Sequence, residues 1–167
     1  MTLMTDKAAT TQVYRVFIKA SPQVIWDAIT KPEWSDRYAY GGRVEYDLRT
    51  GGRYCHKASA EMKSMGLPDE IIIGEVIESD PPHKLVQTWH PVWDPDSAAE
   101  AHTRLTYEIK ENQGGICTVT IIHDVAGAPI VAGMVSGQGD PAQGGGGWPW
   151  VLSDLKTLLE TGQRMAA

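Results

Sequence analysis

The chain has 167 residues and a net charge of −6, from 15 basic and 21 acidic side chains. Its lysines and arginines are scattered, and the negative sum speaks against nucleic acid or an anionic membrane as a partner. No apolar run approaches the roughly 20 residues that span a bilayer, and the first residues lack the pattern of a signal peptide, so we expect a cytoplasmic protein.

The length fits a single domain that buries enough surface to fold without disulfides or a structural metal. We assign this domain to residues 12–164, after an N-terminal tail at residues 1–11. The two cysteines, Cys55 and Cys117, form no CxxC pair, and we expect both to be free thiols.

A strand and two short helices open the domain. The side chains of residues 12–20 alternate between two faces, which predicts a strand. Ser21 and Pro22 then supply the N-cap and the first position of a helix over residues 23–30. A second short helix is predicted over residues 32–38, because a proline ends the first one.

Six short strands follow, joined in pairs by turn-forming segments. They are predicted at residues 42–48, 52–58, 70–79, 83–90, 103–110 and 116–124. Hairpin after hairpin, with no helical pattern between the strands, favours an antiparallel meander over a parallel sheet.

An alanine- and glycine-rich connection occupies residues 125–147 and is longer than most loops of compact domains. Its composition leaves open whether it forms an ordered lid, a helix or a mobile loop. The four glycines at 144–147 predict a flexible hinge, where missing side chains leave space for a ligand or a moving loop. A phosphate loop is not favoured, because no Lys-Ser/Thr pair follows the glycines.

The last element is a helix that begins near Gly146 and ends at Gly162. It carries one apolar stripe with helical spacing, formed by Trp148, Val151, Leu152, Leu155, Leu158 and Leu159. Trp150 falls outside this stripe. We therefore expect Trp150 to be exposed, as part of a lid or of a subunit contact in a homodimer.

This order of elements is α+β, and it resembles the START-like, helix-grip (SRPBCC) superfamily that includes birch-pollen-type allergens. More narrowly, it is similar to bacterial homologues of the C-terminal domain of the heat-shock-protein-90 ATPase activator. The matching stretches are "IKASPQVIWDAITKPEW" (18–34), "DLRTGGRY" (47–54), "GEVIESDPPHKLVQTW" (74–89), "LTYEIKENQGGICTVTIIHD" (105–124) and "GWPWVLSDLKTLLETG" (147–162).

The resemblance implies a curved antiparallel sheet wrapped around the long C-terminal helix, with an apolar cavity between them. Members of the superfamily bind hydrophobic or aromatic small molecules, cyclise polyketides or contact a chaperone. The resemblance carries no universal catalytic motif, so it assigns no catalytic residue to this chain.

Seven residues are candidates for lining that cavity: Trp34, Tyr54, His56, Trp89, Tyr107, His123 and Trp148. Core packing is the simpler interpretation of the tryptophans among them, and it overlaps with lining a pocket. His123 shares the inward face of its strand with Val119 and Ile121. It could hydrogen-bond a ligand oxygen, or it could be a structural histidine bonded to the backbone or to Asp124.

Other kinds of site find little support. His90 and His102 could lie across a hairpin mouth, but no spacing matches a zinc site, so we expect neither metal nor cofactor. The G-x-S-x-G pattern of a serine nucleophile is also missing from the sequence.

The leading interpretation is a cytosolic START-like protein that binds a hydrophobic or aromatic small molecule, rather than an enzyme. The alternative is a polyketide cyclase-like or hydrolase-like enzyme that uses His123 with Tyr54 and Tyr107. A chaperone or regulator interaction module comes third.

Overall fold

The computed structural model describes residues 10–166, and the predicted tail at residues 1–11 falls almost wholly outside them. Seven strands form one sheet: β1 (Thr11–Ile18), β2 (Arg43–Tyr46), β3 (Arg53–Lys57), β4 (Glu70–Asp80), β5 (Lys84–Pro91), β6 (Thr103–Glu111) and β7 (Cys117–Asp124). Their spatial order is β1-β7-β6-β5-β4-β3-β2, and every pairing is antiparallel. The predicted six-strand meander is confirmed, and β1 joins it beside the last strand.

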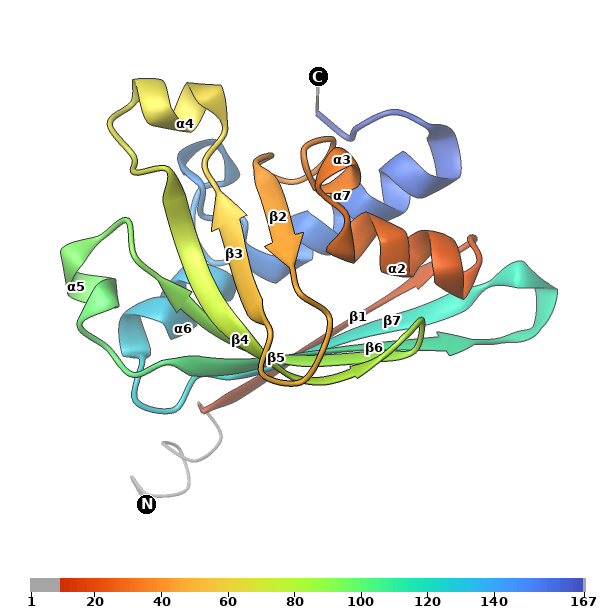
Figure 1. The fold of residues 1–167 in the computed structure, drawn as a ribbon. Coiled ribbons are helices and arrows are strands. Elements are labelled where there is room, and N and C mark those ends of the chain that lie inside the picture. The colour runs from red at the N-terminus through yellow and green to blue at the C-terminus, as the bar shows by residue number, and fades with distance from the viewer. Residues whose placement is uncertain (1–9, 167) are drawn as a thin grey trace, which may run out of the picture.

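Helices lie between the strands and at the C-terminal end. They are α2 (Pro22–Thr30), α3 (Pro32–Ser35), α4 (Ala60–Ser64), α5 (Pro95–Ala98), α6 (Pro129–Val135) and α7 (Gly147–Thr161), with two 3₁₀ turns, η1 (Gln113–Gly115) and η2 (Pro141–Gln143). The sheet is curved, and α2 and α7 lie on the same side of it (Figure 1). This is the α+β helix-grip arrangement that the sequence predicts. None of the helices within residues 10–166 is long and apolar enough to cross a membrane.

The core lies between the inner face of the sheet and α7. In β6 and β7 the period of two puts Leu105, Ile109, Val119 and Ile121 on the inner face, where all four are buried. From α7 the side chains of the predicted apolar stripe meet them, and Trp148, Leu152, Leu155 and Leu158 are buried. Cys55 and Cys117 are free and buried, as expected.

The boundaries of α7 follow the prediction closely. Its N-cap is Gly146, and it ends at Gly162, whose φ of 80° is the left-handed conformation that favours glycine at a helix C-terminus. The Gly162 amide donates to the Leu158 carbonyl at 2.8 Å, which closes the last turn.

Trp150 is not the exposed residue that its helical position predicts. It is half-buried, and its ring stacks on Tyr40 with centroids 6.3 Å apart and an angle of 19° between the planes. The loop between α3 and β2 carries Tyr40 over the side of α7, so the apolar stripe is not the only covered face of this helix.

The space predicted at the hinge is missing at three of its four glycines, and Gly144 alone has open surroundings. A Cβ atom on Gly147 would collide with the Val135 carbonyl oxygen, and one on Gly145 would lie 2.7 Å from the Asp140 nitrogen. A Cβ atom on Gly146 would lie 2.8 Å from the Tyr40 hydroxyl. Glycine is required at positions 145–147 because backbone and side chains pack directly against these residues.

Candidate functional site

Five of the seven candidate residues come together between the sheet and α7. We call Tyr54, Trp89, Tyr107, His123 and Trp148 the aromatic cluster. Ring centroids lie 6.0 Å apart for Trp89 and Trp148, 6.3 Å for Tyr107 and Trp148, and 5.3 Å for Trp89 and His123. Strands β3, β5, β6 and β7 supply four of these side chains on their inner faces, and the first turn of α7 supplies the fifth.

A directed line of hydrogen bonds runs through the cluster. The Trp148 indole Nε1–H donates to His123 Nδ1 at 3.0 Å. The Thr103 hydroxyl donates to the Trp89 carbonyl at 2.6 Å, so it accepts from His123 Nε2–H at 2.8 Å. Because an indole can only donate, these contacts fix His123 as the neutral tautomer with its proton on Nε2.

His123 is therefore fully hydrogen-bonded inside the protein. Its side chain is 0% exposed, and burial lowers its pKa from 6.5 to about 4. The second of the two predicted roles, a structural histidine, matches this geometry, although the partners are Trp148 and Thr103 rather than the backbone or Asp124. With both ring nitrogens occupied, His123 has no free atom for proton transfer to a substrate.

Phenol groups that the sequence analysis did not single out extend the cluster. The Tyr46 ring lies 4.6 Å from the Tyr54 ring, and its hydroxyl donates to Gln87 Oε1 at 2.6 Å. Burial is the main cause that raises the pKa of Tyr46 well above 10, and Tyr54, Tyr107 and Tyr38 each raise this pKa further. Four phenols thus lie within electrostatic range of one another.

A sequence signal for these residues exists. Gln87 lies on the inner face of β5 with Leu85 and Trp89, and Tyr46 lies on the same face of β2 as Val44. Strand parity alone could have selected both residues. Their mutual hydrogen bond depends on the curvature of the sheet, which cannot be predicted from strand parity.

Trp34 and His56 lie apart from the aromatic cluster. The half-buried Trp34 ring is covered by the Arg37 guanidinium, 4.6 Å from the ring centroid. His56 donates from Nε2 to the Gly41 carbonyl at 2.9 Å, and burial lowers its pKa. Both residues thus contact the segment from α3 to β2, and neither makes a ring contact with the cluster.

His90 and His102 lie next to each other, and their rings are stacked. Their rings are 3.8 Å apart and nearly parallel, at 5°. The lone pair of an imidazole lies in the plane of its ring, so parallel stacked rings cannot direct two nitrogens at one metal ion. Within residues 10–166, no three potential metal ligands gather elsewhere either.

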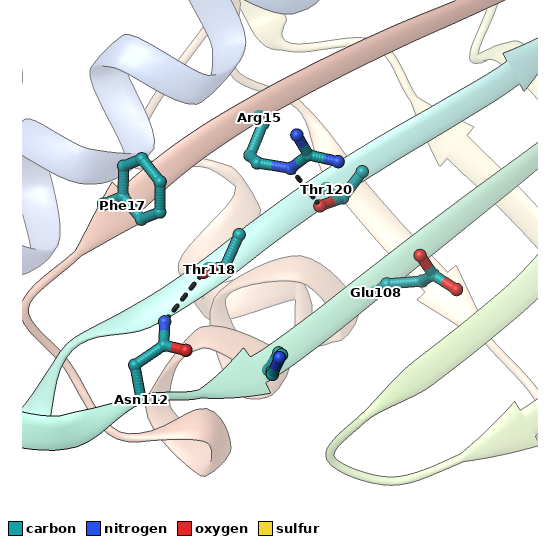
Figure 2. A pocket seen from close by; sticks show the side chains of 7 residues that line it. Arg15, Phe17, Glu108, Asn112, Thr118 and Thr120 are labelled. Carbon is teal, nitrogen blue, oxygen red and sulfur yellow. Dashed lines mark hydrogen bonds between the residues drawn. The ribbon is translucent and has the colours of Figure 1, made fainter.

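None of the seven candidates lines either of two surface hollows, although Tyr46 lies at the smaller one. The larger, about 380 Å³, is on the outer face of β1, β7 and β6. Figure 2 shows its polar lining, with Arg15 donating to Thr120 at 3.3 Å and Glu108 beside them, and with Phe17 at its rim. The smaller, about 260 Å³, lies at β2 and β3 around Arg53 and two carboxylates. Charged linings of this kind do not suit an apolar ligand.

Solved structures with the same fold come from several organisms. Protein MLL2253 from Mesorhizobium loti is 18% identical, with a TM-score of 0.64 over 90% of this chain and 96% of that one. PFC0360w, an HSP90 activator from Plasmodium falciparum, is 20% identical, with a TM-score of 0.54 over 93% and 91%. CalU16 from Micromonospora echinospora is 18% identical, with a TM-score of 0.50 over 68% of this chain and 59% of that one, so the match spans less than two thirds of CalU16.

No curated protein matches the chain in sequence. Residues 19–160, however, match the family model described as "Activator of Hsp90 ATPase homolog 1-like protein". This match covers most of the chain and agrees with the curved antiparallel sheet and its C-terminal helix. The chain therefore belongs to the family of activator of Hsp90 ATPase homolog 1-like proteins, within the START-like SRPBCC superfamily.

Proposed function

We propose that this protein binds a hydrophobic or aromatic small molecule at the aromatic cluster, between the sheet and α7. The observation that carries the proposal is the chemistry of the cluster. Indole and phenol rings from several strands and from α7 face one another, and the one histidine among them is neutral and fully hydrogen-bonded. Such rings offer stacking and apolar contact to a ligand.

The same geometry favours binding over catalysis. General acid–base chemistry needs a side chain that can exchange a proton with the substrate. His123 holds its proton against Thr103 and its lone pair against Trp148. We therefore rank the cyclase-like or hydrolase-like enzyme below a binding protein.

Partial exposure within the interior supports access of a ligand. Tyr46 and Tyr107 are half-buried residues rather than fully buried ones. Desolvation nevertheless raises the pKa of both phenols well above 10. Aromatic residues that are surrounded by protein without being fully buried are typical of the lining of a binding site.

A planar aromatic probe, methyl naphthyl ketone, tests the proposal by tryptophan fluorescence and thermal unfolding. A ligand at the cluster should quench Trp89 and Trp148. At a concentration of 100 times Kd, it should stabilise the fold by about 2.7 kcal/mol, which raises Tm by about 5–10 °C in a domain of this size.

Phe17→Ser is the matched control, because it removes an exposed ring from the rim of the outer hollow. Binding should be unchanged in this variant. The proposal is wrong if Phe17→Ser abolishes binding, or if a panel of lipids and aromatic compounds changes neither the fluorescence nor Tm.

Contact with a chaperone is the second candidate function. It is favoured by the family, which takes its name from an activator of the Hsp90 ATPase, and by the likeness to the Plasmodium falciparum HSP90 activator. Adding the protein to purified Hsp90 and measuring ATP hydrolysis tests it. A saturable rise in rate supports this function, and an unchanged rate across the titration contradicts it.

A further inference from the structure

The charged side chains buried in the protein indicate whether a charged or an uncharged ligand can bind. The polar side chains that are buried within residues 10–166 are Thr30, Ser35, Gln87, His90, Ser97, Thr103, Thr120, His123 and Asp154. This set contains neither lysine nor arginine. Its one acidic member is Asp154, so the interior has a fixed carboxylate and lacks a permanent cation.

Asp154 cannot neutralise the charge of an anionic ligand, because it is itself acidic. Its two carboxylate oxygens accept from the backbone amides of Ala39, at 2.8 Å, and Met165, at 2.6 Å. Its charge also helps to raise the pKa of Tyr38, one of the four phenols that lie near one another. An anionic ligand among these phenols would therefore meet a like charge and no opposite one.

The histidines do not supply the missing cation at neutral pH. Burial lowers the pKa of His123 to about 4, and it also lowers the pKa of His56 and of His90. A ligand carboxylate would lose its hydration on entering the site and would gain no ionic partner there, which is a large penalty.

One phenol of the interior is half-buried and has a hydroxyl that does not already donate a hydrogen bond. The Tyr38 hydroxyl donates to the Ala28 carbonyl, and the Tyr46 hydroxyl donates to Gln87. The Tyr54 hydroxyl accepts from the Trp89 indole, and this tyrosine is only 3% exposed. Among the residues that the structure describes, the Tyr107 hydroxyl has no hydrogen-bond partner. Its half-buried ring lies edge-on to Trp148, at 83°, on the inner face of β6.

We propose that the site takes uncharged aromatic ligands with an oxygen acceptor, that the Tyr107 hydroxyl donates to this oxygen, and that ionised carboxylates are rejected. This inference rests on the proposed function, because it assumes that the aromatic cluster is a binding site. It adds the charge and the polar group of the ligand, and it assigns Tyr107 as the residue that selects them.

Three naphthalene probes with substituents at the same ring position separate these points at pH 7. Methyl naphthyl ketone has a neutral acceptor, naphthoate has a charged one, and ethylnaphthalene has none. In the wild-type protein the Kd of the ketone should be at least about a hundredfold lower than the Kd of naphthoate. The reason is that the carboxylate of bound naphthoate would be buried without an ionic partner.

Tyr107→Phe removes the hydroxyl and keeps the ring. It should weaken the ketone about fivefold, the usual effect of one lost neutral hydrogen bond, and it should leave ethylnaphthalene unchanged. Thermal unfolding of the unliganded variant confirms that it folds. The comparison of the three probes in the wild-type protein does not depend on the variant.

The outcomes distinguish this inference from the proposed function. If naphthoate binds as tightly as the ketone, or if Tyr107→Phe weakens ethylnaphthalene as much as the ketone, ligand binding stands and the inferred selectivity is wrong. If none of the three probes binds the wild-type protein, both proposals are wrong.

Discussion

At the scale of single residues, His123 joins three parts of the fold through two bonds. It accepts from Trp148 on α7 and donates to Thr103 on β6, and Thr103 in turn donates to the backbone of β5. Each of these polar groups is buried, so a neutral imidazole is the form that satisfies all of them. Protonation of Nδ1 would place two donors opposite each other.

This arrangement predicts a loss of stability in mild acid. The pKa of His123 is about 4 in the folded protein and 6.5 as its ordinary value, so the unfolded state binds the extra proton first. The contribution of His123 to the free energy of unfolding should be fully present above about pH 6.5. As the pH falls toward 4, the free energy of unfolding should decrease by about 3 kcal/mol. Burial also lowers the pKa of His56 and His90, which acts in the same direction.

Urea unfolding at pH 7, 6, 5 and 4 measures the effect. His123→Gln is the comparison, because the amide offers one acceptor and one donor but does not titrate in this range. The variant should show a shallower dependence on pH. Equal slopes in the two proteins would mean that His123 is not the responsible group.

At the scale of elements, the start of α7 is held by direct backbone packing. Gly147 has a φ of 61° and sits against the Val135 carbonyl at the end of α6. Gly146 donates from its amide to the Tyr40 hydroxyl at 3.0 Å, and the same hydroxyl donates to the Pro141 carbonyl at 3.0 Å. These contacts bring α6, η2 and α7 together where Trp148 enters the aromatic cluster.

Two glycine substitutions separate close packing from backbone conformation. Gly147→Ala should destabilise the fold by about 2–4 kcal/mol, from the cost of positive φ and from overpacking against Val135. Gly144→Ala has a similar φ, 78°, but open space around it, so it should cost about 1 kcal/mol. Chemical denaturation measures both variants, and equal losses would contradict the role of close packing.

Helices and strands with a strong period could be predicted from the sequence, whereas their surroundings could not. The stripe from Trp148 to Leu159 and the cap at Gly162 locate α7, because they are local signals. The same helical spacing predicted an exposed Trp150, because this spacing carries no information on the loop that brings Tyr40 over the helix. Composition likewise cannot tell whether Gly147 leaves space or is surrounded by other atoms.

At the scale of the whole molecule, Asp154 joins three distant segments. Its carboxylate binds the amide of Ala39, in the loop before β2, and the amide of Met165, after α7. Arg164 closes the arrangement by donating to the Ala39 carbonyl at 3.1 Å. Parity placed His123 on the inner face of its strand, but contacts such as these depend on tertiary packing and have no local signal.

Asp154→Asn should destabilise the protein by about 1–3 kcal/mol, because an amide has one acceptor oxygen and leaves a backbone N–H opposite its own NH₂ group. Ser153→Asn changes the exposed neighbour on the same helix and should stay within about 0.5 kcal/mol of the wild-type protein. Thermal unfolding compares the two variants. A loss no greater for Asp154→Asn than for Ser153→Asn would refute this role of the carboxylate.

The pairing of β1 with β7 also matters while the protein is being made. Each residue of β1 pairs with one about a hundred positions later, from Thr11 with Asp124 to Ile18 with Cys117. At about 5–20 residues per second, a ribosome needs roughly 5–20 s to add that length. During this interval the first strand has no partner. Arg15 and Lys19, charged residues within and just after this apolar segment, are placed where they would oppose its association with other nascent chains.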